Sequence, residues 1–110
     1  MNPNFLQEAY KDDIQAEKIY KDAYTAFQKD DFNTASELLG TIRAKYSKTQ
    51  HLDKVTLLEK MLIRKKNSAS KSKYEQGLKN FIKQYDQSPL KEYAKRLLKA
   101  SEATPPSDVE

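Results

Sequence analysis

The sequence contains no cysteine, no tryptophan, only two glycines and no long apolar run. Without cysteine, the chain can form neither disulfide bridges nor thiolate metal sites. Sheets and tight hairpins need more glycine and proline than this chain carries between its ends. A membrane-spanning helix needs ~20 consecutive apolar residues, and no run approaches that length. These absences favour a fold of long helices and predict no membrane span.

The net charge of +4 is distributed unevenly along the 110 residues. Residues 1–51 carry 7 basic and 8 acidic residues, whereas residues 52–99 carry 13 basic and 5 acidic residues, a net charge of +8. Residues 100–110 carry three acidic residues and no basic one. The basic half can meet an anionic partner, although a lysine-rich helical surface also serves solubility alone.

Apolar residues recur at helical spacing along almost the whole chain, which predicts an all-α fold. Polar segments that separate these apolar stripes are expected at Lys29–Asp31, Ser47–Gln50, Asn67–Ser72 and Asp86–Pro89. The last of the three residues Lys29–Asp31 is a suitable N-cap for the helix that follows. Ser88 can cap the last helix, with Pro89 in its first turn. The stripes lie at residues 5–10, 16–27, 32–46, 52–62, 74–85 and 90–98, and predict five helices, or six if the first two are separate.

Two segments share one pattern: an aromatic residue, a small residue three positions later, and a large apolar residue four positions after that. A small residue lets two helix backbones approach closely, and the aromatic residue fills the gap at the open end of the helix pair. The small residues are 42 positions apart, a spacing found in helical repeat arrays. The two sets are Phe32, Ala35, Leu39 and Tyr74, Gly77, Phe81.

The stretch Ala23–Ala35 resembles the centre of a tetratricopeptide repeat (TPR), with alanine at both ends in the two small positions and Phe27 and Phe32 in the aromatic ones. Tyr74–Pro89 resembles a second helix of such a repeat, and its Tyr-Asp-Gln-Ser-Pro ending is similar to the closing segment of bacterial envelope TPR proteins. The resemblance covers roughly residues 15–100. The spacing of 42 departs from the ~34 residues of a standard TPR, and the second repeat is correspondingly longer.

The resemblance implies antiparallel helix hairpins in a right-handed superhelical stack. We expect an N-terminal helix or linker at residues 1–14, followed by a TPR-like domain at residues 15–103. Residues 104–110, which include two adjacent prolines, are expected to be a disordered tail. Within the domain, repeat 1 spans about 15–47, repeat 2 about 50–87, and a capping helix 89–103.

A narrower resemblance concerns Ile19–Phe27, His51–Leu58 and Tyr74–Leu90. Their order is similar to the C-terminal region of TPR lipoproteins that serve gliding motility and type IX secretion in Bacteroidetes. It implies that the chain is a fragment, with a lipoprotein signal and further repeats upstream, located in the periplasm or cell envelope. Otherwise the polar start of the chain predicts a cytoplasmic protein.

No catalytic residue, metal ligand or cofactor site is predicted. His51 is the single histidine, and at a helix start it is expected to be a surface or capping residue. The adjacent carboxylates of Asp12–Asp13 and Asp30–Asp31 point to different sides of a helix and form no catalytic dyad. Two isolated glycines cannot form a phosphate-binding loop. An enzyme is therefore disfavoured.

The TPR resemblance implies that the first helix of each pair lines a concave groove. Tyrosines in such a groove offer an apolar ring and a hydroxyl to a protein or peptide partner. The alternative is that these tyrosines merely seal the first helix. The lysine and asparagine pattern that clamps a peptide carboxylate in some TPR domains is absent. The predicted partner-binding residues are Glu17, Tyr20, Tyr24 and Gln28.

The densest basic cluster offers an alternative contact, for an anionic partner such as nucleic acid, an acidic protein or a lipid headgroup. It can equally be a solvated loop. Because the cluster contains no aromatic residue on which bases could stack, single-stranded nucleic acid is disfavoured. The cluster consists of Arg64, Lys65, Lys66, Lys71 and Lys73. The sequence thus predicts a non-enzymatic scaffold that binds another protein, with a basic helical domain for nucleic acid or another anion as the alternative.

Overall fold

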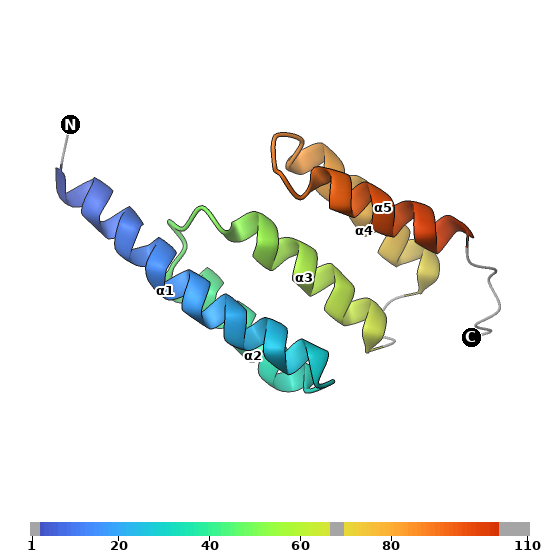
Figure 1. Ribbon diagram of the computed structural model, residues 1–110, viewed down its shortest axis with the longest axis horizontal. Helices are drawn as coiled ribbons and strands as arrows, with labels where there is room; N and C mark the ends of the chain where they lie inside the picture. The colour runs from blue at the N-terminus through green and yellow to red at the C-terminus, as the bar shows by residue number, and fades with distance from the viewer. Residues whose placement is uncertain (1–2, 67–69, 104–110) are drawn as a thin grey trace. The chain divides into compact units, whose positions relative to one another are not determined.

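A computed structural model describes the backbone of residues 3–66 and 70–103, and the side chains from residue 10 onward within those ranges. The described residues form five helices and no strand, which confirms the all-α prediction (Figure 1). The chain divides into two compact units, Met1–Val55 and Thr56–Glu110. The helices are α1 (Pro3–Gln28), α2 (Phe32–Lys45), α3 (Leu52–Lys65), α4 (Lys71–Gln84) and α5 (Lys91–Ala103).

The first two apolar stripes belong to one continuous helix, α1, of 26 residues. Asp12 and Asp13 lie within this helix, and both carboxylates contact the segment that precedes α3, so the expectation that they point to different sides is wrong. Asp12 Oδ2 accepts a hydrogen bond from the Lys48 backbone N–H at 3.3 Å, and Asp13 Oδ1 accepts one from the Gln50 N–H at 2.7 Å. These bonds hold the 48–50 segment, where we expected a loop, against the middle of α1.

The turn between α1 and α2 is built from three residues. Asp30 has a φ of +62°, a left-handed conformation that ends α1. The Asp31 N–H then donates to the Ala26 carbonyl at 2.8 Å and the Asp30 N–H to the Phe27 carbonyl at 3.1 Å, which satisfies two carbonyls at the end of α1. The Asp31 side chain in turn accepts from the Thr34 N–H at 3.3 Å and caps α2, as predicted.

Small residues allow α1 and α2 to pack closely along each other. The two TPR-like small positions, Ala23 and Ala35, are both fully buried. The two TPR-like aromatic rings, of Phe27 and Phe32, lie near the α1–α2 turn with centroids 6.4 Å apart. Other buried apolar side chains of the first unit are Ala16, Ala26, Leu39, Ile42 and Val55.

In the second unit, α4 packs along α5, and the C-terminal part of α3 contributes Leu57 and Met61 to the same core. Phe81 and Leu78 are fully buried there, and the Phe81 and Tyr85 ring centroids are 5.0 Å apart. The buried core consists of Leu57, Tyr74, Leu78, Phe81 and Ala94, with Met61, Ile82, Tyr85, Leu90, Leu97 and Leu98 packed against it.

The expectation of close backbone approach at Gly77 is wrong. A Cβ at this position would meet only the side chain of Lys60, at 3.5 Å or more, which is an ordinary van der Waals contact. The flexible lysine stem, rather than a helix backbone, covers this glycine. Gly77 and Lys60 together line a space between α3 and α4.

The ends of α4 and α5 use serines. Ser70 caps α4 by accepting from the Lys73 N–H at 3.2 Å; residues 67–69 of the predicted connector lie outside the described residues. Ser88 closes a turn instead of capping a helix. Its Oγ accepts a hydrogen bond from the Leu90 N–H at 3.0 Å, and its carbonyl oxygen accepts one from the Lys91 N–H. Since the first helical bond then starts at the Leu90 carbonyl, α5 begins at Lys91, two residues later than expected. The predicted tail, 104–110, also lies outside the described residues.

Candidate partner-binding site

The four residues predicted to bind a partner all lie on one side of α1. Their spacings of three or four residues place them within less than a quarter turn of the helix surface. Tyr24 is 39% exposed, whereas Tyr20 is half-buried. Glu17 is half-buried and Gln28 is exposed at the last turn of α1. We call the set Glu17, Tyr20, Tyr24 and Gln28 the tyrosine face.

Aromatic rings follow each other from this face to the start of α2. The Tyr20 and Tyr24 centroids are 6.3 Å apart, and those of Tyr24 and Phe27 are 6.2 Å apart. Phe27 continues to Phe32 at 6.4 Å. Tilted rings at these separations attract one another and restrain each other's rotamers. We call these four rings the aromatic ladder; Tyr24 is its exposed member.

Two lysines contact members of the tyrosine face. Lys54 places its Nζ 5.9 Å from the centroid of the Tyr20 ring, a cation–π contact within the first unit. Glu17 pairs with Lys21 at 4.0 Å, one helical turn along α1. The Tyr20 ring is therefore fixed from one side, and Tyr24 offers its ring and hydroxyl to solvent.

Two exposed apolar residues on α1 were missed by sequence reasoning. Tyr10, which we placed on a buried stripe, is 67% exposed, and Ile14 is 41% exposed. At 100° per residue, both lie within about half a right angle of Gln28 around α1, on the side of the tyrosine face. The four-residue spacing of Tyr10 and Ile14 was the signal that could have revealed them.

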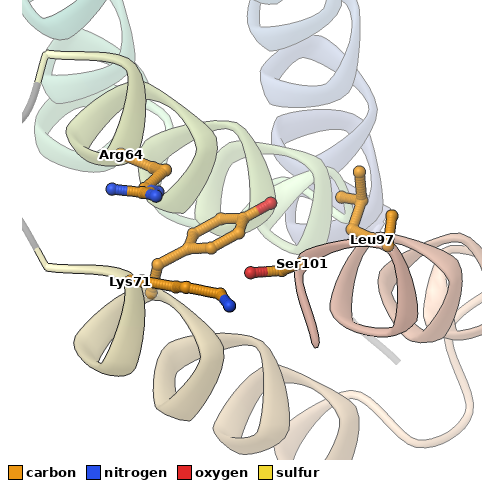
Figure 2. Close-up of a pocket in the computed structure, with 6 residues that line it drawn as sticks. Arg64, Lys71, Leu97 and Ser101 are labelled. Carbon is orange, nitrogen blue, oxygen red and sulfur yellow. The ribbon is translucent and has the colours of Figure 1, made fainter. Parts of the chain in front are cut away.

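The five residues of the predicted basic cluster differ in exposure and in the cavity that they line. Lys65 and Lys66 are exposed at the end of α3. Arg64 and Lys71 instead line a cavity of about 270 Å³ between α3, α4 and α5 (Figure 2). Lys73 lines a second cavity, of about 410 Å³, between α3 and α4. The first cavity is lined by Arg64, Lys71, Tyr74, Leu97, Ala100 and Ser101, and the second by Lys60, Ile63, Lys73, Tyr74, Gln76, Gly77 and Asn80.

Tyr74 lines both cavities and is itself buried. Burial raises the pKa of its hydroxyl above the ordinary value, and the nearby Tyr93 and Glu75 raise it further, whereas the positive charge of Arg64 opposes the shift. The Tyr74 hydroxyl therefore stays protonated across the physiological range and can donate a hydrogen bond.

One family of proteins matches almost the whole chain. The model of the YfiO family, described as outer membrane lipoprotein, matches residues 12–107. The chain belongs to the YfiO family. No curated protein and no solved structure matches it.

YfiO-family proteins are of the TPR type, form a non-catalytic scaffold family and interact with other proteins. The membership confirms the TPR-type resemblance and the expectation of a lipoprotein family of the cell envelope. The family membership does not support the narrower resemblance to Bacteroidetes lipoproteins, which stays a prediction.

Among the described helices of this YfiO-family chain, none has both the length and the apolar character that crossing a membrane requires. The described part of the chain also contains no group of three or more His, Cys, Asp or Glu side chains that could hold a metal ion. His51 lies immediately before α3, where its carbonyl accepts the first helical bond from Val55 and its N–H donates to Thr49 Oγ1 at 3.1 Å. This is the helix-start position that we predicted for it.

Proposed function

We propose that the chain is a non-enzymatic TPR-type module that binds a protein partner on the tyrosine face of α1. The observation that carries the proposal is the exposed Tyr24 ring, held by its neighbours Tyr20 and Phe27 at about 6 Å. A pre-ordered aromatic ring loses little conformational entropy on binding, and such rings are frequent energetic anchors of protein interfaces. The YfiO family's interaction with other proteins supports this reading.

The tyrosine face combines apolar, polar and charged groups, as the centre and rim of a protein interface do. Tyr24 supplies apolar area with a hydroxyl, while Glu17 and Gln28 can fix a partner's orientation through hydrogen bonds. Tyr10 and Ile14 extend the apolar area toward the N-terminus of α1. An extended segment or a helix of the partner would contact these residues in turn along the axis of α1.

We place the partner in a cell-envelope machine, in secretion or gliding motility. The support is the narrower resemblance of Ile19–Phe27, His51–Leu58 and Tyr74–Leu90, together with the outer-membrane description of the family. The predicted arrangement of two repeats and a capping helix in a right-handed superhelical stack belongs to the same proposal.

Site-directed photo-crosslinking in the bacterium that carries the gene tests the binding face. A photoreactive phenylalanine analogue would replace Tyr24 in one strain and Tyr93 in another. Tyr93, on α5, is 41% exposed, so the two probes have nearly equal access to solvent. We expect a discrete crosslinked protein, identified by mass spectrometry, from position 24 only. Equal products from both positions, or none from position 24, would contradict the proposed face.

The variant Tyr20→Ser/Tyr24→Ser complements the crosslinking. We expect it to lose the partner identified above while it keeps its helical circular dichroism. Tyr24→Ser alone is the safer variant for folding, because Tyr20 is half-buried under Lys54. If Tyr24→Ser stays folded and retains the partner, the tyrosine face is not the binding site.

A further inference from the structure

The cavity between α3, α4 and α5 has the lining of a carboxylate site (Figure 2). We propose that it receives an aspartate or glutamate side chain from an acidic segment of a partner protein. This site lies on other helices than the tyrosine face and uses charge where that face uses aromatic rings. A test of this site therefore does not depend on whether the tyrosine face binds a partner.

Two cations from different helices line this cavity. Arg64 comes from the last turn of α3 and Lys71 from the first residue of α4. In the view of Figure 2 the Lys71 nitrogen lies near the Ser101 oxygen, and the Arg64 nitrogens lie farther from Leu97. Lys71 lies at the positive end of the α4 dipole, so the backbone adds to the positive potential at this place. A guanidinium group can bind both oxygens of a carboxylate, which makes Arg64 suited to this ligand.

The chain's own Glu75 places a carboxylate beside this cavity, and two residues of the lining contact it. Glu75 Oε2 accepts a hydrogen bond from Ser101 Oγ at 2.7 Å and lies 4.0 Å from Lys71 Nζ. The Lys71 and Glu75 side chains are only 21% and 19% exposed, so water screens their interaction less than it would at an open surface. A carboxylate is thus already held by Lys71 and Ser101 at the edge of this cavity.

The rest of the lining suits the side chain of a peptide residue. Leu97, Ala100 and the Tyr74 ring form apolar walls that suit the methylene groups of a glutamate. The volume of this cavity, about 270 Å³, suits one such side chain. The protonated Tyr74 hydroxyl can add a donated hydrogen bond to the carboxylate.

The second cavity extends the site beyond one side chain. It shares Tyr74 with the first and carries two more cations, Lys60 and Lys73. Gln76 donates to Asn80 Oδ1 at 3.1 Å along the same side of α4, so amide groups are also at hand for a peptide backbone. Two neighbouring basic cavities suit an acidic segment with carboxylates at more than one position.

A protein fits this lining better than a nucleic acid or a membrane does. Single-stranded nucleic acid stacks its bases on exposed aromatic rings, and the one aromatic ring in the lining, that of Tyr74, is buried. Membrane surfaces require a broad apolar face beside the cations. Of the described residues that line the two cavities, Ile63 alone is an exposed large apolar side chain.

The test is an NMR titration of the ¹⁵N-labelled chain with an end-blocked Gly-Ser-Glu-Leu-Glu-Ser-Gly peptide. The matched probe replaces both Glu residues with Gln. We expect shifts of the Lys71 and Ser101 amide signals with the Glu peptide only, weakening as salt is raised. Single-stranded DNA and phosphatidylglycerol vesicles serve as the other probes. If either binds at these residues and the Glu peptide does not, the proposal is wrong.

Variants show where the peptide binds and whether its affinity depends on these residues or only on the net charge of the protein. Arg64→Gln and Lys71→Gln should each weaken peptide affinity about three- to fivefold, the typical effect of a partly exposed ion pair. Lys83→Gln, an exposed position on α4, should leave it unchanged. Glu75→Gln should raise affinity about threefold because it removes a competing carboxylate, whereas Glu92→Gln makes the same change of net charge outside the cavity. Equal effects of the two glutamate variants, or unchanged affinity in both Arg64→Gln and Lys71→Gln, would overturn the site.

Discussion

The carboxylate of Asp13, in the middle of α1, accepts a hydrogen bond from the hydroxyl of Thr49 at 2.7 Å across 36 positions of sequence. The same Oδ1 atom accepts from the Gln50 N–H at 2.7 Å. Asp13 thus holds in place the segment that leads into α3, where the buried Thr49 would otherwise lack this partner.

We expect Asp13→Asn to lower the free energy of unfolding by about 1–2 kcal/mol at neutral pH, because hydrogen bonds to a charged acceptor are replaced by weaker ones. Urea unfolding followed by circular dichroism measures the loss. Asp22→Asn, at an exposed position on the same helix, is the control. A loss of the same size in both variants would show that charge alone, rather than the bonds to Thr49 and Gln50, is responsible.

The effect of Asp13 should also depend on pH. Burial raises the pKa of Asp13, but the hydrogen bonds from Gln50 and Thr49 and the charge of His51 outweigh it and leave the pKa below its ordinary value of 3.8. A lowered pKa in the folded state stabilises the fold above the unfolded-state value, and this contribution disappears as the pH falls through the folded-state value. The stability difference between the parent and Asp13→Asn should therefore be constant near neutrality and shrink below about pH 4. A difference that grows in acid would contradict this assignment.

Ala35→Leu should destabilise the first unit. Ala35 is fully buried where α2 packs along α1, so three additional carbons must displace neighbours, at a cost of about 1–3 kcal/mol. Ala44→Leu, at an exposed position of α2, adds the same atoms without such crowding. Thermal melting of the two variants provides the comparison, and equal melting temperatures would place Ala35 outside the helix contact.

Both glycines should tolerate alanine and gain stability from it. Beyond its own helix backbone and chain neighbours, an added Cβ at Gly40 in α2 would have no atom within 4 Å, and at Gly77 it would first meet the Lys60 Cδ at 3.5 Å. Alanine is favoured over glycine within a helix by up to about 1 kcal/mol. Each variant should therefore melt at a higher temperature than the parent. Destabilisation by Gly77→Ala would mean that the Lys60 side chain cannot move aside.

Adjacent residues in the α1–α2 turn should respond with opposite signs. Asp30 has a left-handed φ of +62°, a conformation that glycine adopts without strain, so Asp30→Gly should preserve or raise stability. Asp31 is the N-cap of α2, and Asp31→Ala should cost about 1 kcal/mol. Denaturant titrations of both variants, with Asp22→Asn as the charge control, test the pair. A loss from Asp30→Gly as large as that from Asp31→Ala would contradict this division of roles.

Short-range features of the fold could be predicted from the sequence, because neighbouring residues determine them. Asp31 caps α2 through a residue three positions away, and the buried Ala23 and Ala35 follow from helical spacing. The bond from Thr49 to Asp13 could not be predicted, since nothing within either segment indicates that they meet.

The basic residues show the same limit within the candidate site. Arg64 and Lys65 are neighbours in sequence, yet a helix turns about 100° between them, so Arg64 lines a cavity and Lys65 is exposed. Which turn faces the cavity depends on how α3, α4 and α5 pack. At Gly77, likewise, the direction of the Lys60 side chain determines how much space remains, and composition does not reveal it.

The aromatic ladder of α1 also gives the protein an optical property. Because the chain has no tryptophan, its intrinsic fluorescence comes from tyrosine. Excitation can migrate between the Tyr20 and Tyr24 rings, whose centroids are 6.3 Å apart. A partner that brings a tryptophan onto this face would therefore quench tyrosine emission and gain additional tryptophan emission by energy transfer. Binding of such a partner to this face would therefore be measurable by intrinsic fluorescence, without a label.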